Sequence, residues 1–376
     1  MNKLLSNFMN LSRIAPASHF RTVAAAAPSP PDVPSEMKLL STPSTPRAPS
    51  YRLLKAYAPS NIFEWMKCVG AYWGQSKHPY LTYDQTTGIT EIPNQTSISL
   101  AADWGSGSEE AVKVAQNISA FRPAYTIHLG DTYYVGNEAE VNENFLGVKT
   151  SEYDPVAFPR GTRGTFALMG NHDMFTNGNA FFDIVLPALG QKASFFCLRN
   201  DRWTIVGLDT GYNSTGIQFW PFLKPSCRLH DEQMKWLASL DLQHDPRRLI
   251  LLSHHQPWSA FEAGYPRPWQ QVSELLGGVN KKEVLWFWGH EHRLAMYRPY
   301  QRVTGRCIGH GGMPVELKNP KNTDTCECTF TDQRLYTNSE GLKVGYNGFA
   351  NLIFDGPMLR VDYRDVDNLV VYREGF

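Results

Sequence analysis

Five short apolar runs recur along the chain, and each one stops at a polar cluster. The runs cover residues 96–101, 124–129, 164–169, 248–253 and 283–288. Apolar runs of this length that stop at polar or turn-forming residues are typical of buried β-strands. We therefore expect several strands of a sheet to end in polar side chains.

The segments between these strands predict helices. Ser108 precedes an acidic first turn and a one-sided apolar face that reaches Ile118, which is the pattern of a capped amphipathic helix. Further helices are expected at residues 138–145, 229–240 and 268–276, and later strands at 349–354, 358–363 and 369–372. Strands that alternate with helices indicate an α/β fold, with α+β character where the last strands follow one another.

The residues that follow the five apolar runs are of the types that bind metals. They are Asp103; Asp131 with Tyr134; Asn171 with His172 and Asp173; His254 with His255; and His290 with His292. The carboxyl ends of strands in an open α/β sheet meet at one rim, so we expect these side chains to converge. Carboxylate, imidazole, amide and phenolate groups are ligands of Fe, Mn and Zn. The pattern predicts a dinuclear metal site in which Asp131 bridges the ions.

The spacing of His290 and His292 supports that prediction. Side chains alternate along extended backbone, so both imidazoles lie on one face and Glu291 points away. Two metals about 3.5–4 Å apart can orient a hydroxide and clamp both oxygens of an in-line displacement, as in many phosphatases and nucleases.

In this order the clusters resemble the blocks of the calcineurin-like metallophosphoesterases, from Asp103 to His292. The resemblance covers residues 96–376 and implies a two-sheet β-sandwich flanked by helices, with the metals at the carboxyl ends of the strands. Gly105 stands where most members have a histidine ligand, and Tyr134 is the third residue after Asp131. Both departures resemble the purple acid phosphatases, in which a tyrosinate replaces that histidine on a ferric ion.

The resemblance implies one site for Fe(III) and one for a divalent Fe, Zn or Mn ion. The implied ferric ligands are Asp103, Asp131, Tyr134 and His292, and the implied divalent ligands are Asp131, Asn171, His255 and His290. Tyr133 is the rival phenol, at a different offset from the family pattern. His254 is the rival of His255, and is otherwise a substrate-binding or supporting group.

Three further residues receive roles from the same resemblance. His172 would protonate the leaving group as general acid, and Asp173 would orient its ring or cap a helix. His310, in a glycine-rich stretch, would touch the substrate or serve as a structural histidine.

The implied activity is hydrolysis of phosphomonoesters by a metal-bound hydroxide, an acid phosphatase-like reaction. The metal ligands alone also suit a phosphodiesterase acting on small molecules or cyclic nucleotides. A binding module that keeps metal without catalysis is the third possibility, and its mark would be missing ligands.

Charge and composition limit the kinds of partner that we expect this chain to bind. Lysine plus arginine and aspartate plus glutamate number 36 each, so no net field attracts nucleic acid or an anionic membrane. No apolar run approaches the ~18 residues that span a bilayer. We expect a small phosphorylated substrate and neither nucleic acid nor a membrane as partner; the sequence defines no oligomeric state.

The N-terminal region differs from the rest of the chain. Residues 1–50 are rich in Pro, Ala and Ser and predict a disordered tail, and residues 51–95 predict an aromatic-rich segment that wraps the catalytic domain of residues 96–376. The absence of a secretory signal and of a cysteine framework favours a cytoplasmic protein. The basic, acid-poor start is compatible with mitochondrial targeting, and the resemblance to purple acid phosphatases implies secretion.

Overall fold

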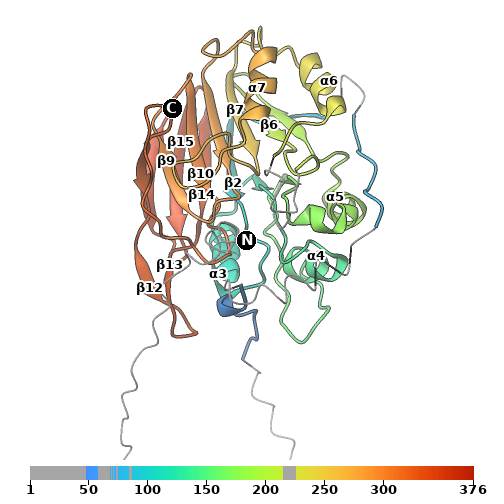
Figure 1. The fold of residues 1–376 in the computed structure, drawn as a ribbon, viewed down its shortest axis with the longest axis vertical. Helices are drawn as coiled ribbons and strands as arrows, with labels where there is room; N and C mark the ends of the chain where they lie inside the picture. Colours follow the sequence, from blue (N-terminus) through green and yellow to red (C-terminus); the bar gives the residue numbers. More distant parts are fainter. Residues whose placement is uncertain are drawn as a thin grey trace, which may run out of the picture.

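The computed structural model describes residues 48–57, 68, 70, 72, 75–83, 87–214 and 226–376. Two β-sheets pack face to face, with helices on their outer faces (Figure 1). Residues 1–47 of the expected tail lie outside the described residues. The predicted mixed α/β fold with a two-sheet sandwich is confirmed.

The first sheet contains eight strands in the order β1-β5-β6-β7-β8-β10-β9-β11. Their bounds are Ile89–Glu91, Phe196–Arg199, Trp203–Leu208, Arg248–Ser253, Val284–Trp288, Val303–Ile308, Leu294–Tyr297 and Cys328–Thr331. Strands β6, β7, β8 and β10 run parallel to one another. Their carboxyl ends therefore lie at the same edge of the sheet.

The second sheet contains six strands in the order β16-β15-β14-β2-β3-β4. Their bounds are Val370–Gly375, Met358–Asp365, Gly348–Asp355, Gln95–Ala101, Tyr125–His128 and Gly164–Ala167. Strands β2, β3 and β4 are parallel, whereas β14 pairs antiparallel with β2. A separate hairpin joins β12 (Leu335–Thr337) to β13 (Lys343–Gly345).

Helices cover both outer faces. Helices α6 (Asp231–Ser239) and α7 (Pro266–Leu275) pack on the eight-stranded sheet, and α3 (Glu109–Phe121), α4 (Glu138–Asn144) and α5 (Leu186–Leu189) pack on the six-stranded sheet. Short turns of other helix types are η1 (Leu54–Tyr57), η3 (Asp173–Thr176) and η4 (Phe181–Val185). Among the helices described, none is long and apolar enough to cross a membrane.

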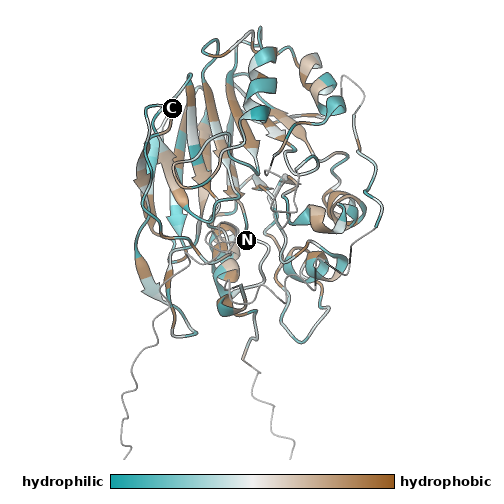
Figure 2. Ribbon diagram, viewed as in Figure 1, coloured by the Kyte–Doolittle hydropathy of each residue, from teal (hydrophilic) through white to brown (hydrophobic). Residues whose placement is uncertain are grey.

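Strand β7 shows how alternation builds the two layers of core. Ile250 and Leu252 face the space between the sheets and share a cluster with Leu100 of β2. Leu251 faces the opposite way and shares a cluster with Trp236 of α6. Figure 2 shows the resulting concentration of hydrophobic residues along the strands. A strand buried on both faces reads as a continuous apolar run, which is the pattern seen in the sequence.

The helix boundaries follow from local capping. Ser108 accepts a hydrogen bond from the backbone N–H of Ala111 at 3.1 Å, so α3 begins where the sequence predicts. Helix α6 begins at Asp231, two residues later than expected, because His230 caps it with a ring nitrogen that accepts from the N–H of Glu232. These boundaries fix the lengths of the loops between strands and helices.

Candidate metal centre

Three predicted ligands have left-handed backbone just beyond a strand. Asp103 follows β2 with φ 55°, Asp131 follows β3 with φ 75°, and His290 follows β8 with φ 65°. Residues other than glycine rarely adopt this conformation, and those that do gather at functional sites. The loops after these strands are therefore held by their surroundings rather than by local preference.

Two glycines allow the loops after β3 and β4 to touch. A Cβ atom at Gly170 would lie 2.0 Å from Oδ1 of Asp131. One at Gly130, whose φ is 104°, would lie 2.7 Å from the backbone nitrogen of Gly170. A side chain at either position would push the loops apart. The glycines of the Gly-Asp and Gly-Asn blocks thus bring Asp131 beside Asn171.

The first group of candidate ligands surrounds the hydroxyl of Tyr133. This oxygen lies 2.9 Å from Oδ1 of Asp103, 3.1 Å from Oδ2 of Asp131 and 3.0 Å from Nε2 of His292. The phenol is buried. Two carboxylates, an imidazole and a phenol are a donor set that suits a hard, highly charged ion.

Tyr134, the tyrosine indicated by the family spacing, points elsewhere. Its hydroxyl donates to the carbonyl of Ala56 at 2.6 Å, and its ring lies 4.8 Å from that of Tyr57. A β-bridge between Gly105 and Thr132, in which the N–H of Tyr133 donates to the carbonyl of Gly105, sets the register of the loop. The predicted position of Tyr134 at the site therefore differs from the structure, in which Tyr133 presents its hydroxyl to the candidate ligands.

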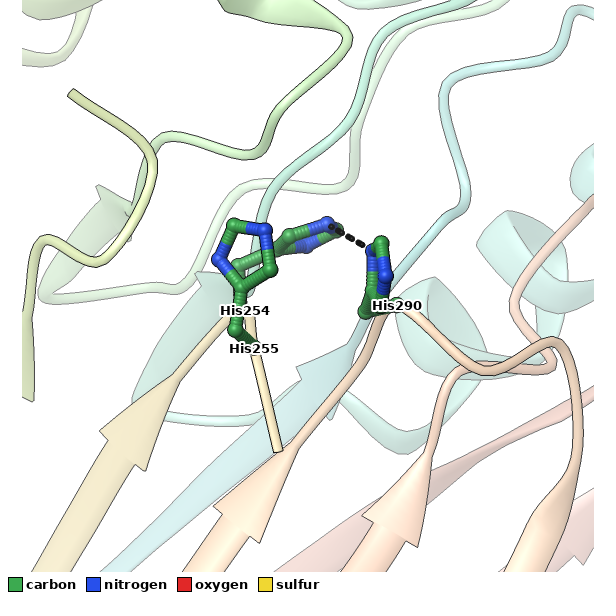
Figure 3. Close-up of side chains that lie close together, drawn as sticks. All are labelled: His254, His255 and His290. Atoms are coloured by element: carbon green, nitrogen blue, oxygen red, sulfur yellow. Dashed lines mark hydrogen bonds between the residues drawn. The ribbon is translucent and has the colours of Figure 1, made fainter. Parts of the chain in front are cut away.

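The second group of candidate ligands surrounds Nε2 of His254. This atom lies 3.0 Å from Oδ1 of Asn171, 3.4 Å from Oδ2 of Asp131 and 3.3 Å from Nδ1 of His290. Figure 3 shows His254 and His290 turned toward each other from the ends of their strands. The other ring nitrogen of His254 lies 3.0 Å from the carbonyl of Leu129, which fixes the ring and directs Nε2 to the site.

His255 has a different environment. Its Nδ1 lies 3.0 Å from the hydroxyl of Thr210, and its ring packs 4.7 Å from that of His290. Its ligand atom can still join those of His254 and His290 within 4.8 Å. Of these two histidines, it is His254 that contacts both Asp131 and Asn171, so His254 fits the ligand position predicted for His255.

The donor set fits a pair of metal ions. Asp103, Asp131 and His254 form one group with ligand atoms within 4.8 Å of one another, and His254, His255 and His290 form another. Burial would raise the pKa of Asp131, but the charges of His254 and His172 hold it well below its usual range. Burial and the carboxylates of Asp103 and Asp131 raise the pKa of Tyr133 well above its usual range. A phenol must lose its proton to bind a metal ion. The phenol of Tyr133 would do so only if cations bound beside the two carboxylates.

His172 stands at the open side of this centre. Its backbone N–H donates to Oδ1 of Asp131 at 2.8 Å, and its side chain is 21% exposed. Its Nδ1 lies 2.5 Å from the carbonyl of Tyr134, so Nε2 is the nitrogen on the side of Asp131, 3.9 Å from Oδ2. The carbonyl of Tyr134, and not a carboxylate, orients the ring.

Asp173 has a role that the sequence did not indicate. Its carboxylate accepts the backbone N–H groups of Gly170 at 2.9 Å and of Asp131 and Thr132 at 3.2 Å each. It neither orients the ring of His172 nor caps η3, whose capping position is His172 with no side-chain bond. The two predicted roles are corrected: Asp173 ties the loops after β3 and β4 together.

His310 is not at the open face. It is 2% exposed, and burial lowers its pKa to about 4. Its Nε2 lies so near Gly348 that a Cβ atom there would be 2.8 Å away. The structural interpretation of His310 fits this environment, and the substrate-binding interpretation does not.

The model of the calcineurin-like phosphoesterase family matches residues 96–294, which contain all the candidate ligands described above. The chain belongs to this family. A comparison with curated protein sequences gives no match. The chain resembles several solved structures at low identity.

Three of these structures illustrate the range. Purple acid phosphatase PPD1 from yellow lupin (Lupinus luteus) seeds is 18% identical, with a TM-score of 0.51, over 76% of this chain and 54% of that chain. GAP50 of Plasmodium is 15% identical, with a TM-score of 0.47, over 74% of this chain and 88% of that chain. A dimetal phosphatase from Danio rerio is 12% identical, with a TM-score of 0.46, over 74% of this chain and 98% of that chain.

A largely buried ionic network lies behind the candidate histidine ligands. Glu291 faces away from the site, as the spacing predicts, and accepts from the hydroxyl of Ser259. Arg293, the next residue on that side, is fully buried, with Nη2 2.5 Å from Oε2 of Glu316 and 3.8 Å from Oε1 of Glu262.

Sequence reasoning missed this network because its carboxylates are distant along the chain. Arg293 directly follows the His-x-His block and was the available signal. Lys318 completes the set, with Nζ 2.8 Å from Glu316 and 3.3 Å from Glu262. In addition, Sγ of Cys307 lies 3.4 Å from the carbonyls of Glu291 and Arg293. The backbone that carries His290 and His292 is thus supported from behind.

Replacing Arg293 by Met should strongly destabilise the protein. The substitution leaves the buried Glu291 and the partly buried Glu262 and Glu316 with only Lys318 as counter-charge, which should cost about 3–5 kcal/mol. Urea unfolding in the presence of a chelator measures the loss without a contribution from metal binding.

Arg298→Met is the matched control, because its pair with Glu327 at 2.8 Å is solvent-exposed. Such a pair contributes at most about 1 kcal/mol. Equal losses for the two variants would contradict a specific role for Arg293.

His254→Ala and His255→Ala should differ in metal content. His254 contacts Asp131 and Asn171, so its removal should cost roughly one of two bound ions. The His255→Ala variant should retain most of both bound metal ions. Elemental analysis of the purified variants measures the ratio of metal to protein, and a loss confined to His255→Ala would reverse the assignment.

Proposed function

We propose that this chain hydrolyses phosphomonoesters of small molecules with two metal ions bound at the rim of the sandwich. The observation that carries the proposal is the position of the Asp131 carboxylate between the two ligand groups. Its Oδ2 lies 3.1 Å from the hydroxyl of Tyr133 on one side and 3.4 Å from Nε2 of His254 on the other. A carboxylate in this position suits a bridge between two ions.

The residues that would hold the metals fall into two sets. Asp103, Asp131, Tyr133 and His292 would hold one ion, and Asp131, Asn171, His254 and His290 the other. When bound, such ions lower the pKa of water and neutralise charge on a phosphoryl group. We infer Fe(III) for the first set because it contains the phenol, and a divalent Fe, Zn or Mn ion for the second.

The protein's own part in the reaction centres on His172. The carbonyl of Tyr134 accepts a hydrogen bond from Nδ1–H of His172, which turns Nε2 to the open side of the site; Nε2 carries a proton when the ring is in its imidazolium form. A leaving alkoxide of a bound phosphoester would take that proton. The N–H of His172 also holds Oδ1 of Asp131, which couples the position of the acid to that of the carboxylate. Both groups would thus be oriented before substrate arrives.

Asp131→Asn should reduce hydrolysis of p-nitrophenyl phosphate by at least about 100-fold, because a neutral amide is a poor bridge between cations. Release of p-nitrophenol by the metal-loaded variant measures the loss. Comparison with bis-p-nitrophenyl phosphate ranks monoester against diester hydrolysis in the parent protein. Full activity of protein stripped of metal would refute the proposal.

Tyr133→Phe should remove a charge-transfer absorption band that Tyr134→Phe leaves in place. Tyrosinate bound to Fe(III) absorbs visible light, and the hydroxyl of Tyr133 is the one between Asp103, Asp131 and His292. The measurement is the optical spectrum of aerobically purified protein, with iron content determined in parallel. Loss of the band only in Tyr134→Phe would restore the original spacing-based assignment.

A further inference from the structure

A second concave surface lies at the opposite ends of the strands that carry the candidate metal centre. It is a cavity of about 1050 Å³ lined by residues at the starts of β7, β8 and β10. Arg248 opens β7 at the cavity, and His254 follows the end of the same strand at the metal centre. At ~3.3 Å per residue, about 20 Å separates the two. The cavity is a separate site.

The lining of this cavity is positively charged. Its five cationic side chains are Arg247, Arg248, Lys281, Lys282 and Arg302, and its two carboxylates are Asp245 and Glu283. Five minus two leaves an excess of three positive charges, in a protein whose formal net charge is zero. These side chains come from segments separated by tens of residues, so the fold, and not a local run of basic residues, gathers them.

The two carboxylates are already occupied. Asp245 accepts from Nη1 of Arg247 at 3.0 Å and from the hydroxyl of Thr204 at 2.6 Å. Oε1 of Glu283 lies 2.9 Å from Nη2 of Arg302. Neither carboxylate forms an ion pair with Arg248 or Lys281 in the described part of the chain.

The other three cations keep their charge unpaired. Lys282 donates to the carbonyls of Leu242 and Asp245, which carry no net charge. Arg248 lies over the ring of Trp203 at 4.4 Å, and Lys281 is exposed. Within the described part of the chain, no carboxylate forms an ion pair with Arg248 or Lys281. Burial lowers the pKa of Lys282; the charge of Asp245 opposes this shift, and the charges of Arg199 and Arg247 add to it.

We propose that this cavity binds a small molecule that carries two or more phosphate groups. Concave surfaces lined by one sign of charge focus the field and concentrate counter-charged ligands. Guanidinium and ammonium groups are the side chains that recognise phosphate oxygens. The volume is that of a small-molecule site. The zero net charge of the chain argues against a nucleic acid as the ligand.

Isothermal titration calorimetry with methylenediphosphonate, a hydrolysis-resistant analogue of pyrophosphate, tests this site. The parent protein should bind the probe saturably, with an affinity that falls as ionic strength rises. The double variant Arg248→Gln/Lys281→Gln should bind at this site at least about tenfold more weakly, because two charged donors are lost. Binding of the probe to the metal centre would persist in the double variant and is thereby separated.

Two controls make the outcome decisive. Lys343→Gln changes an exposed lysine on β13, outside the cavity, and should leave the affinity unchanged. Lys281→Gln alone changes only an exposed side chain, so its melting temperature should match the parent while its affinity falls several-fold. Hydrolysis of p-nitrophenyl phosphate by the double variant reports on the metal centre independently. Absence of binding to the parent protein, or equal affinity in the parent and the double variant, would overturn the proposal.

Discussion

The carboxylate of Asp173 is the contact on which the candidate metal centre depends. It accepts N–H groups from Gly170, Asp131 and Thr132, and so joins the loops that follow β3 and β4. Asp131 has a left-handed backbone, which is costly for a residue other than glycine, and this clamp compensates for that cost. Burial and the nearby charge of Asp131 raise the pKa of Asp173 to about 7. Three N–H donors favour the ionised form and partly offset both effects.

The rest of the centre follows from parallel strands. Strands β2, β3 and β4 in one sheet and β7 and β8 in the other present their carboxyl ends to the same rim, so five loops contribute candidate ligands without long connections. The geometry differs between the two sides. The ligands from β2 and β3 are carboxylates aided by a phenol, whereas those from β7 and β8 are imidazoles backed by the Arg293 network. Two sheets that pack face to face over one core thus contribute two unlike halves of a single site.

The sequence predicted the strands and the family, but not which of two adjacent residues faces the candidate metal centre. Apolar runs report burial, and the runs of β3, β7 and β8 predicted strands correctly because both faces of these strands are largely buried. The choice of Tyr133 over Tyr134, and of His254 over His255, depends on which side chain a loop turns inward. The bridge from Gly105 to Thr132 settles the first, and the carbonyl of Leu129 settles the second. Both are contacts between distant segments, so no local pattern carries them. The clamp by Asp173 and the pairing of Arg293 with Glu316 are of the same kind.

The ends of β7 and β8 also constrain how the cationic cavity could affect the metal centre. Both strands pair with neighbours along their whole length and are buried, so they transmit little displacement. A phosphate ligand at Arg248 and Lys281 would relieve repulsion among the unpaired cations and would bind the folded chain alone. Its effect would therefore be stabilisation of the sheet by mass action, of about 2.7 kcal/mol at a concentration of 100 Kd. Since the His254 ring is fixed by the carbonyl of Leu129 on the other sheet, its position depends on how the two sheets are held together. Stabilisation of the sheet at the cavity would then reduce the fraction of molecules that open locally and lose metal. The geometry of the candidate ligands in the closed molecules would stay the same.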